Sequence, residues 1–195
     1  MTKPTSSSEV LTFLASRRSS KPALLSAPGP SAEELAQILT IASRVPDHKK
    51  LAPWRFIVFE GDARRKFGEV LAEVCAREEK APSEARLTTE RERFLSAPLV
   101  IAVVSAPVQT TAVPEIEQTL SAGAATFSIC LAANAMGYAT SWLTQWYAFS
   151  PGVRAALDLA PSERFAGFVY IGTAKERQAE RDRPDLSRIV MRYGA

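Results

Sequence analysis

Residues Glu115–Gly137 read EIEQTLSAGAATFSICLAANAMG and predict a long helix that runs from Pro114 to Gly137. Most side chains inside this stretch are small, and no charged residue occurs from Gln118 through Val153. A helix that faced solvent along one side would carry charges there. We therefore expect this helix to be the central helix of the domain and also half of an interface between subunits.

A membrane-spanning segment is the other explanation for such a charge-free region, and the composition argues against it. Ser, Thr, Asn and Gln recur throughout the region, and it contains no run of about 18 consecutive apolar residues. The N-terminal residues, MTKPTSSSEV, lack the apolar core of a signal peptide. We expect a cytoplasmic protein that does not enter a membrane.

Strand patterns lie on both sides of the long helix. They occur at residues 54–59, 99–104, 139–146 and 165–172. The continuous apolar run at 99–104 is typical of a strand that is covered on both faces. Because these strands and the predicted helices do not alternate strictly, the pattern favours an α+β domain.

Polar residues mark where other helices begin. Capping boxes formed by Ser6 with Glu9 and by Ser31 with Glu34 predict the starts of the first two helices. The pair Ser150-Pro151 predicts a helix start near the end of the charge-free region. The charged stretch from 77 to 93 is interpreted as a surface loop or a short helix.

Composition narrows the class of protein. A chain of 195 residues with 46% hydrophobic content fits one domain with a sizeable core. The net charge is +3 and the cations are spread along the chain, so nucleic acid is not the expected partner. Cys75 and Cys130 lie at apolar positions of helical patterns and lack metal-site spacing. We interpret them as buried thiols in a reducing compartment.

Several familiar functional motifs do not occur in the sequence. It contains no GxGxxG after a strand, no phosphate loop ending in Gly-Lys-Ser/Thr, no HExxH and no GxSxG. His48 is the only histidine. A zinc site is therefore not favoured, and nothing identifies a nucleophile that His48 would activate.

Cations gather where the first two predicted helices end. Arg17 and Arg18 precede Ser19 after the first helix, and Arg44 and His48 follow the second. Guanidinium groups together with a hydroxyl match the oxygens of a phosphate. The alternative is that cations near helix C-termini only offset the helix dipole. The pattern alone leaves both explanations open.

Six segments together carry a resemblance to a known family, because they occur in a characteristic order over nearly the whole chain. They are RRSS (17–20), RVPDHKKLAPWRFIVFEG (44–61), SAPLVIAVV (96–104), EIEQTLSAGAAT (115–126), GYATSWLT (137–144) and FAGFVYIGT (165–173). The chain resembles the FMN-dependent nitroreductase family, and in particular its small, compact NAD(P)H nitroreductases.

The resemblance implies both a fold and an assembly. The fold is an α+β, three-layer α/β/α sandwich with a mixed, mainly antiparallel sheet. The assembly is an obligate homodimer that exchanges terminal segments and holds two FMN sites at its interface. Residues 1–195 would form a single FMN-binding domain, with residues 1–7 flexible and residues 174–195 forming a charged C-terminal arm.

The resemblance also implies roles for individual residues. The FMN phosphate and ribityl chain would be held by Arg17, Arg18 and Ser19, and the flavin would be approached by Arg44 and His48. The isoalloxazine ring would lie along the backbone of Ser141, Trp142 and Leu143. Relatives often carry arginine in place of Leu143 and glycine before this point. Arg181 and Arg183 would add phosphate contacts, with solvated charges as the alternative.

The implied chemistry needs no catalytic side chain and no metal. NADH or NADPH would reduce FMN, and a nitroaromatic, quinone or related small acceptor would then reoxidise it by a ping-pong mechanism. Acceptors for dehalogenation or enone reduction are a second possibility within enzymes. A flavin-binding sensor or carrier without turnover is the alternative from another class. The sequence does not decide between NADH and NADPH, nor does it identify the acceptor.

Overall fold

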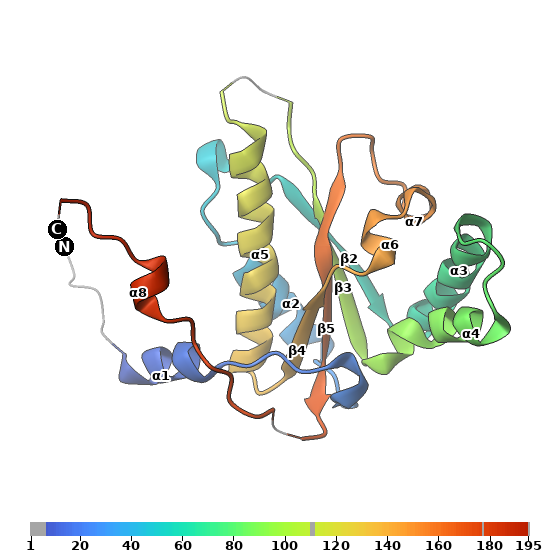
Figure 1. Cartoon of the computed structure of the whole chain (residues 1–195), viewed down its shortest axis with the longest axis horizontal. Helices are drawn as coiled ribbons and strands as arrows, with labels where there is room; N and C mark the ends of the chain where they lie inside the picture. The colour runs from blue at the N-terminus through green and yellow to red at the C-terminus, as the bar shows by residue number, and fades with distance from the viewer. Residues whose placement is uncertain (1–6, 110–111, 177, 195) are drawn as a thin grey trace.

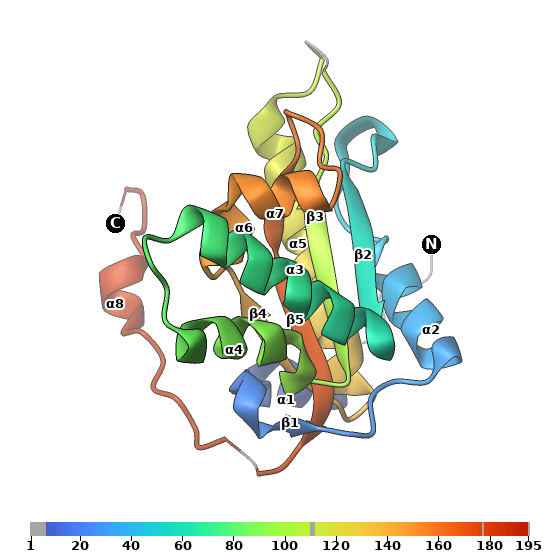
Figure 2. The same cartoon turned by 90° about the vertical axis from the view of Figure 1, so that its right-hand side faces the viewer.

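The computed structural model describes residues 7–109, 112–176 and 178–194, and in this part of the chain helices cover both faces of a five-stranded sheet (Figures 1 and 2). The strands are β1 (Leu25–Ser26), β2 (Trp54–Glu60), β3 (Leu99–Ser105), β4 (Ala139–Leu143) and β5 (Arg164–Ala174). Their order is β1-β5-β3-β2, and β4 also pairs with β5. All of these pairings are antiparallel. The predicted mainly antiparallel sheet is confirmed.

Helices form the two outer layers, except that the first and last helices of the described residues lie to one side of the sheet (Figure 1). The helices are α1 (Ser8–Ser16), α2 (Ala32–Ala42), α3 (Asp62–Glu78), α4 (Glu84–Glu92), α5 (Glu115–Ala135), α6 (Trp146–Phe149), α7 (Pro151–Ala156) and α8 (Leu186–Ile189), with the 3-10 turns η1 (Pro22–Leu24), η2 (His48–Lys50) and η3 (Arg93–Ser96). In Figure 2, α3, α4, α6 and α7 lie on the near face of the sheet, and α5 and α2 lie behind it. This arrangement is the predicted three-layer sandwich.

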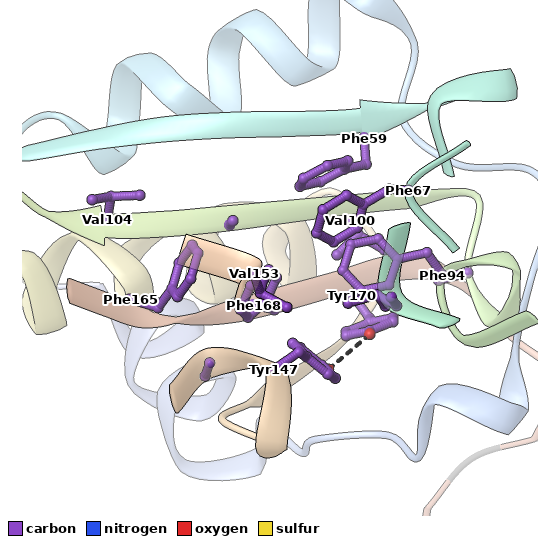
Figure 3. Packing of buried hydrophobic residues seen from close by; sticks show 14 of the residues in the cluster. Phe59, Phe67, Phe94, Val100, Val104, Tyr147, Val153, Phe165, Phe168 and Tyr170 are labelled. Atoms are coloured by element: carbon purple, nitrogen blue, oxygen red, sulfur yellow. Dashed lines mark hydrogen bonds between the residues drawn. The ribbon is translucent and has the colours of Figure 1, made fainter. Parts of the chain in front are cut away.

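Strand β3 separates two hydrophobic cores. All of its residues are buried, and successive side chains point to opposite faces of the sheet. Val100, Ala102 and Val104 pack in the core under α3 and α6, whereas Leu99, Ile101 and Val103 pack in the core under α2 and α5. The first core is rich in aromatic rings (Figure 3). The continuous apolar pattern of residues 99–104 is therefore explained by burial on both sides.

Helix α5 matches the predicted long helix closely. It ends at Ala135, and Gly137 takes a left-handed conformation with φ of 90° just beyond the end, as expected of a glycine that terminates a helix. The helix buries its small side chains against the sheet and against α2. Its outer side exposes Ile116, Leu120 and Phe127. The helix is thus central to the fold and also presents an uncharged apolar stripe.

Two predicted element boundaries need correction, and two are confirmed. Ser6 lies outside the described residues, and the N-cap of α1 is Ser7, whose hydroxyl accepts a hydrogen bond from the Val10 N–H. The strand predicted at 139–146 ends at Leu143, because helix α6 begins at residue 146. The capping box of Ser31 with Glu34 and the cap of Ser150 are present as predicted.

The charged stretch 77–93, interpreted as a surface loop or a short helix, does contain a short helix, but not all of it lies at the surface. It contains the end of α3, all of α4 and the first residue of η3, and within it the side chain of Glu90 is completely buried. Cys75 and Cys130 are both free and buried, as predicted. Burial raises the pKa of the Cys130 thiol to about 11, so this thiol is inert at neutral pH. Across the described ranges, no helix has the length and apolar character needed to cross a membrane.

Candidate functional site

Pairing of β1 with β5 brings the segment before β1 close to the segment after β5. Leu25 of β1 lies opposite Ala174 at the end of β5, and the Lys175 N–H donates to the carbonyl oxygen of Leu24. The residues before β1 and the residues after β5 therefore leave the sheet at the same corner. In Figure 1 the C-terminal segment runs back past α1 from this corner.

Four arginines from these two segments line one pocket of about 630 Å³. Arg17 and Arg18 come from the end of α1, and Arg181 and Arg183 come from the segment before α8. We call this the arginine pocket; its other lining residues are Leu14, Ala15, Asp182 and Pro184. Because a single carboxylate accompanies four guanidinium groups in the lining, the pocket favours anionic ligands.

Hydrogen bonds fasten the C-terminal segment to α1 at this pocket. Nε of Arg18 donates to the carbonyl oxygen of Ala179 at 3.1 Å, and the Arg183 guanidinium donates to the carbonyl oxygen of Ala15. Arg183 also pairs with Glu180 at 2.5 Å, and this contact lowers the pKa of the Glu180 carboxyl. These contacts hold arginines that are far apart in sequence within one small region.

The chain then leads from the arginine pocket to a second pocket. Ser19 is exposed, and the buried Ser20 donates its N–H to the carbonyl oxygen of Thr140 in β4 at 2.8 Å. A few residues later the chain lines what we call the Leu143 pocket, of about 380 Å³. Its lining residues are Pro22, Ala23, Thr89, Glu92, Arg93, Ser96, Leu143, Gln145 and Tyr170.

The three predicted residues of β4 differ in where their side chains lie. Ser141 is buried, whereas Leu143 lines the Leu143 pocket. The partly exposed Trp142 donates from Nε1 to the carbonyl oxygen of Ala166 at 3.1 Å. Its indole occupies the place that a side chain at Gly167 would fill, since a Cβ there would lie 2.0 Å from Nε1. Trp142 therefore packs on its neighbouring strand, away from the Leu143 pocket.

Sequence reasoning missed two residues at the Leu143 pocket. Arg93 lines it, and the buried Glu90 accepts hydrogen bonds from the Arg93 guanidinium, at 2.5 Å for Nε. Both lie in the stretch 77–93 that was interpreted as a surface loop or a short helix, and Glu90 reaches the pocket through Arg93. A signal was present in the sequence, because Glu90 has arginines four residues before it and three residues after it, which are distances that meet on a helix.

Arg44 and His48 lie apart from the arginine pocket within one chain. Nδ1 of His48 is 2.8 Å from Oε2 of Glu117, near the start of α5. Arg17, in contrast, lies over the ring of Phe127, ten positions further along the same helix. At a rise of about 1.5 Å per residue, the two contacts are about 15 Å apart along α5. Arg44 lines a separate pocket of about 680 Å³ with Trp54 and Lys50.

The loop that carries His48 is held in one conformation by several contacts. The Asp47 carboxylate accepts hydrogen bonds from the N–H groups of Leu51 and Ala52, at 3.1 and 2.8 Å. The hydroxyl of Ser121 on α5 donates to the carbonyl oxygen of Pro46 at 2.6 Å. Ala52 has φ of 46°, a left-handed conformation that is costly for a residue with a side chain. The loop is therefore fixed relative to α5.

Comparison with known proteins identifies the family. The model of the Nitroreductase family matches residues 14–173, which is most of the chain and includes β4 and all but the last residue of β5. The chain is 36% identical over 168 residues to the Escherichia coli K12 protein named "Putative NAD(P)H nitroreductase YdjA", covering 85% of this chain and 88% of YdjA. The chain belongs to the nitroreductase family.

Solved structures agree with the nitroreductase fold. The nitroreductase-like family protein from Bacillus cereus matches with a TM-score of 0.82 and 20% identity, over 100% of both chains. A Desulfovibrio desulfuricans protein solved in complex with FMN matches with a TM-score of 0.73 and 22% identity, over 97% of this chain and 99% of that one. The predicted family and the predicted fold are confirmed, and the chain is an oxidoreductase of this family.

Proposed function

We propose that this member of the nitroreductase family binds FMN, takes electrons from NADH or NADPH, and passes them to a nitroaromatic, quinone or related small acceptor. One observation carries the proposal. The arginine pocket and the Leu143 pocket are joined by a single short segment, residues 17–23, which lines both of them. A ligand with an anionic end and a flat, polar-edged end fits this arrangement.

The arginine pocket suits the phosphate end of FMN. Each guanidinium group has five N–H donors, more than the carbonyl contacts of Arg18 and Arg183 require. Forked donors of this kind match phosphate oxygens, and charge-assisted hydrogen bonds are among the stronger ones in proteins. We therefore assign the phosphate to Arg17, Arg18, Arg181 and Arg183, with the ribityl chain beside Ser19.

The Leu143 pocket suits the ring end. Leu143, Pro22 and Ala23 offer apolar surface, while Arg93 and Gln145 offer polar groups to ring edges. FMN, when bound, would supply two-electron redox chemistry between NADH or NADPH and the acceptor. The protein binds and orients the ring, so no protein nucleophile is needed. Because the nucleotide and the acceptor use one pocket in turn, the expected order is ping-pong.

We further propose a homodimer with FMN sites at the interface. Within one chain, Arg44 and His48 line pockets that are separate from the arginine pocket. A second copy packed on the apolar stripe of α5 would bring its own His48 loop toward the arginine pocket. Large apolar side chains are exposed on this stripe, on α1 and on the C-terminal segment, as expected for surfaces that a partner covers: Leu11, Ile116, Leu120, Leu186, Ile189 and Met191.

The same proposal includes the bounds of the domain, the partners of the protein and its location in the cell. Residues 1–195 act as one FMN-binding domain, and residues 174–195 serve as an arm that supplies Arg181 and Arg183. Small-molecule acceptors are the expected partners, nucleic acid is not, and the cytoplasm is the expected location because NADH and NADPH are abundant there.

Steady-state kinetics test the activity. Protein loaded with FMN should oxidise NADH or NADPH only when an acceptor such as a nitroaromatic or a quinone is added. Double-reciprocal plots at several fixed acceptor concentrations should give parallel lines, as in ping-pong kinetics. Protein that retains FMN, yet is reduced by neither nicotinamide, would favour a sensor or carrier and contradict the proposed activity.

A further inference from the structure

Glu90 is a fully buried carboxylate in the middle of a charged cluster. It accepts hydrogen bonds from the guanidinium groups of Arg93 and Arg86, and from Nε1 of Trp146 at 3.1 Å. A carboxylate removed from water is tolerated only when such partners compensate the lost hydration. The two arginines point to different places, since Arg93 lines the Leu143 pocket and Arg86 lines a pocket beside Phe149.

Arg93, one of the two arginines of this cluster, is adjacent in sequence to a tightly packed part of the core. The next residue, Phe94, is fully buried and packs against five aromatic rings, with centroid separations of 4.9 to 5.8 Å. The Arg93 guanidinium lies over the ring of Tyr147, whose hydroxyl oxygen is 2.9 Å from that of Tyr170 (Figure 3). Tyr170 in turn lines the Leu143 pocket. Arg93 is thus fixed relative to the pocket wall.

Other charged groups near the cluster are closer to water. Glu79 pairs with Arg86 at 3.1 Å and is about half exposed, with 46% of its side-chain surface accessible. Glu92 lines the Leu143 pocket and is also exposed. Water and salt screen exposed charges much more strongly than buried ones. The buried carboxylate and its two guanidinium groups therefore dominate the field that this cluster exerts on the pocket.

We propose that Glu90 is a positioning residue for the ring end of the flavin site, and that the Glu90–Arg93–Arg86 cluster sets the reduction potential of bound FMN. The inference rests on the proposed function. Uptake of a hydride, which is two electrons and one proton, adds one negative charge to a bound flavin ring. Positive charge near the ring stabilises that form and raises the potential, whereas negative charge lowers it.

Single charge changes of opposite sign test this inference. Glu90→Gln removes a negative charge and should shift the midpoint potential of bound FMN to a more positive value. Arg86→Gln removes a positive charge and leaves the Glu90–Arg93 contact in place. It should shift the midpoint potential of bound FMN to a more negative value. Arg93→Gln should give a larger negative shift, because Arg93 lines the pocket itself. Arg65→Gln is the matched control, since its partner Asp62 and its own side chain are exposed on α3.

Midpoint potentials measured by equilibration with reference dyes distinguish the outcomes. FMN binding by the wild-type protein is measured first, and failure to bind would overturn the proposed function itself. If FMN is bound, equal potentials in all variants, or shifts of one sign for Glu90→Gln and Arg86→Gln, would show a purely structural role for Glu90 and overturn the inference. If Glu90→Gln does not fold, the other three variants still test the inference. The midpoint potential should be lowest in Arg93→Gln, intermediate in Arg86→Gln, and close to the wild-type value in Arg65→Gln, and any other order would overturn the inference.

Discussion

Nε of Arg18 donates a hydrogen bond to the carbonyl oxygen of Ala179, a residue 161 positions later in the chain. This contact joins the end of the first helix to the C-terminal segment that carries Arg181 and Arg183. The arginine pocket is therefore completed only when the segments on both sides of the sheet corner are in place. Changes in either segment should affect ligand binding more than they affect the stability of the core.

Replacing Arg18 tests its assignment to the phosphate. Arg18→Ala should weaken FMN binding by about 10-fold to 100-fold, since a hydrogen bond to a charged group contributes about 1.5–3 kcal/mol. The melting temperature without FMN should stay close to that of the wild-type protein, because the side chain lies at the surface of the pocket. FMN fluorescence titration measures the affinity. Arg65→Ala, which removes an exposed arginine outside both pockets, is the control, and an unchanged affinity in Arg18→Ala would reject the phosphate role.

His48 provides a test of the loop and of the dimer. His48→Ala should reduce FMN affinity or kcat/KM for the acceptor at least about tenfold, with little change in stability. An exposed pair such as His48 with Glu117 contributes only about 0–1 kcal/mol to folding. Lys49→Ala is the matched control, because it removes a neighbouring exposed cation. Wild-type kinetics in His48→Ala would show that His48 is an ordinary loop residue.

The aromatic core predicts a large loss of stability when the ring of Phe94 is removed, although none of the proposed ligand contacts involves this residue. Phe94→Ala should destabilise the protein by about 3–5 kcal/mol, as is typical when a buried aromatic ring is removed. Phe149→Ala removes a ring that is 72% exposed, and should change stability by no more than about 0.5 kcal/mol. Urea unfolding of both variants measures the difference. Similar midpoints for the two would contradict the described packing.

The ion pair of Arg55 with Glu163 predicts a dependence of stability on pH. Arg55 Nε lies 2.7 Å from Glu163 Oε1, and this contact lowers the pKa of the Glu163 carboxyl below its ordinary value of 4.5. A lowered pKa in the folded state means that the pair stabilises the fold above pH 4.5 and that this contribution disappears as the pH falls through the lowered pKa. Arg55→Gln should therefore be less stable than the wild-type protein at neutral pH.

The difference between Arg55→Gln and the wild-type protein should shrink in acid. Urea unfolding at neutral pH and well below the pKa of Glu163 measures this difference, with Lys49→Gln as the control because it removes an exposed cation. A stability difference that does not change with pH would show that Arg55 contributes through packing of its side chain, and not through its charge.

Periodicity and capping residues predicted most of the fold. The strands predicted at 54–59, 99–104 and 165–172 were found because β-branched and aromatic residues run together there, and α5 was found because Pro114 and Gly137 mark its ends. Strand β1 was missed, since two residues carry no periodicity. The end of β4 was missed by a few residues, because Gln145 to Phe149 has aromatic residues that suit either a strand or a buried turn of helix.

The site was harder to predict, because its parts meet only through tertiary structure. Nothing local in the sequence joins Arg18 to Arg183; the pairing of Leu25 with Ala174 does so. Glu90 was missed for a related reason. A charged residue in a charged stretch is usually exposed. Glu90 is instead buried beside its arginine partners and Trp146, which lies 56 positions away in the sequence.

Comparing the binding of FMN with that of riboflavin tests the central claim most directly, because the two differ only in the phosphate that we assign to the arginine pocket. Fluorescence titration of the purified wild-type protein should show saturable FMN binding and much weaker riboflavin binding. Arg18→Ala should bring the two affinities closer together by weakening FMN alone. Equal affinity of the wild-type protein for both ligands, or binding of neither, would contradict the account.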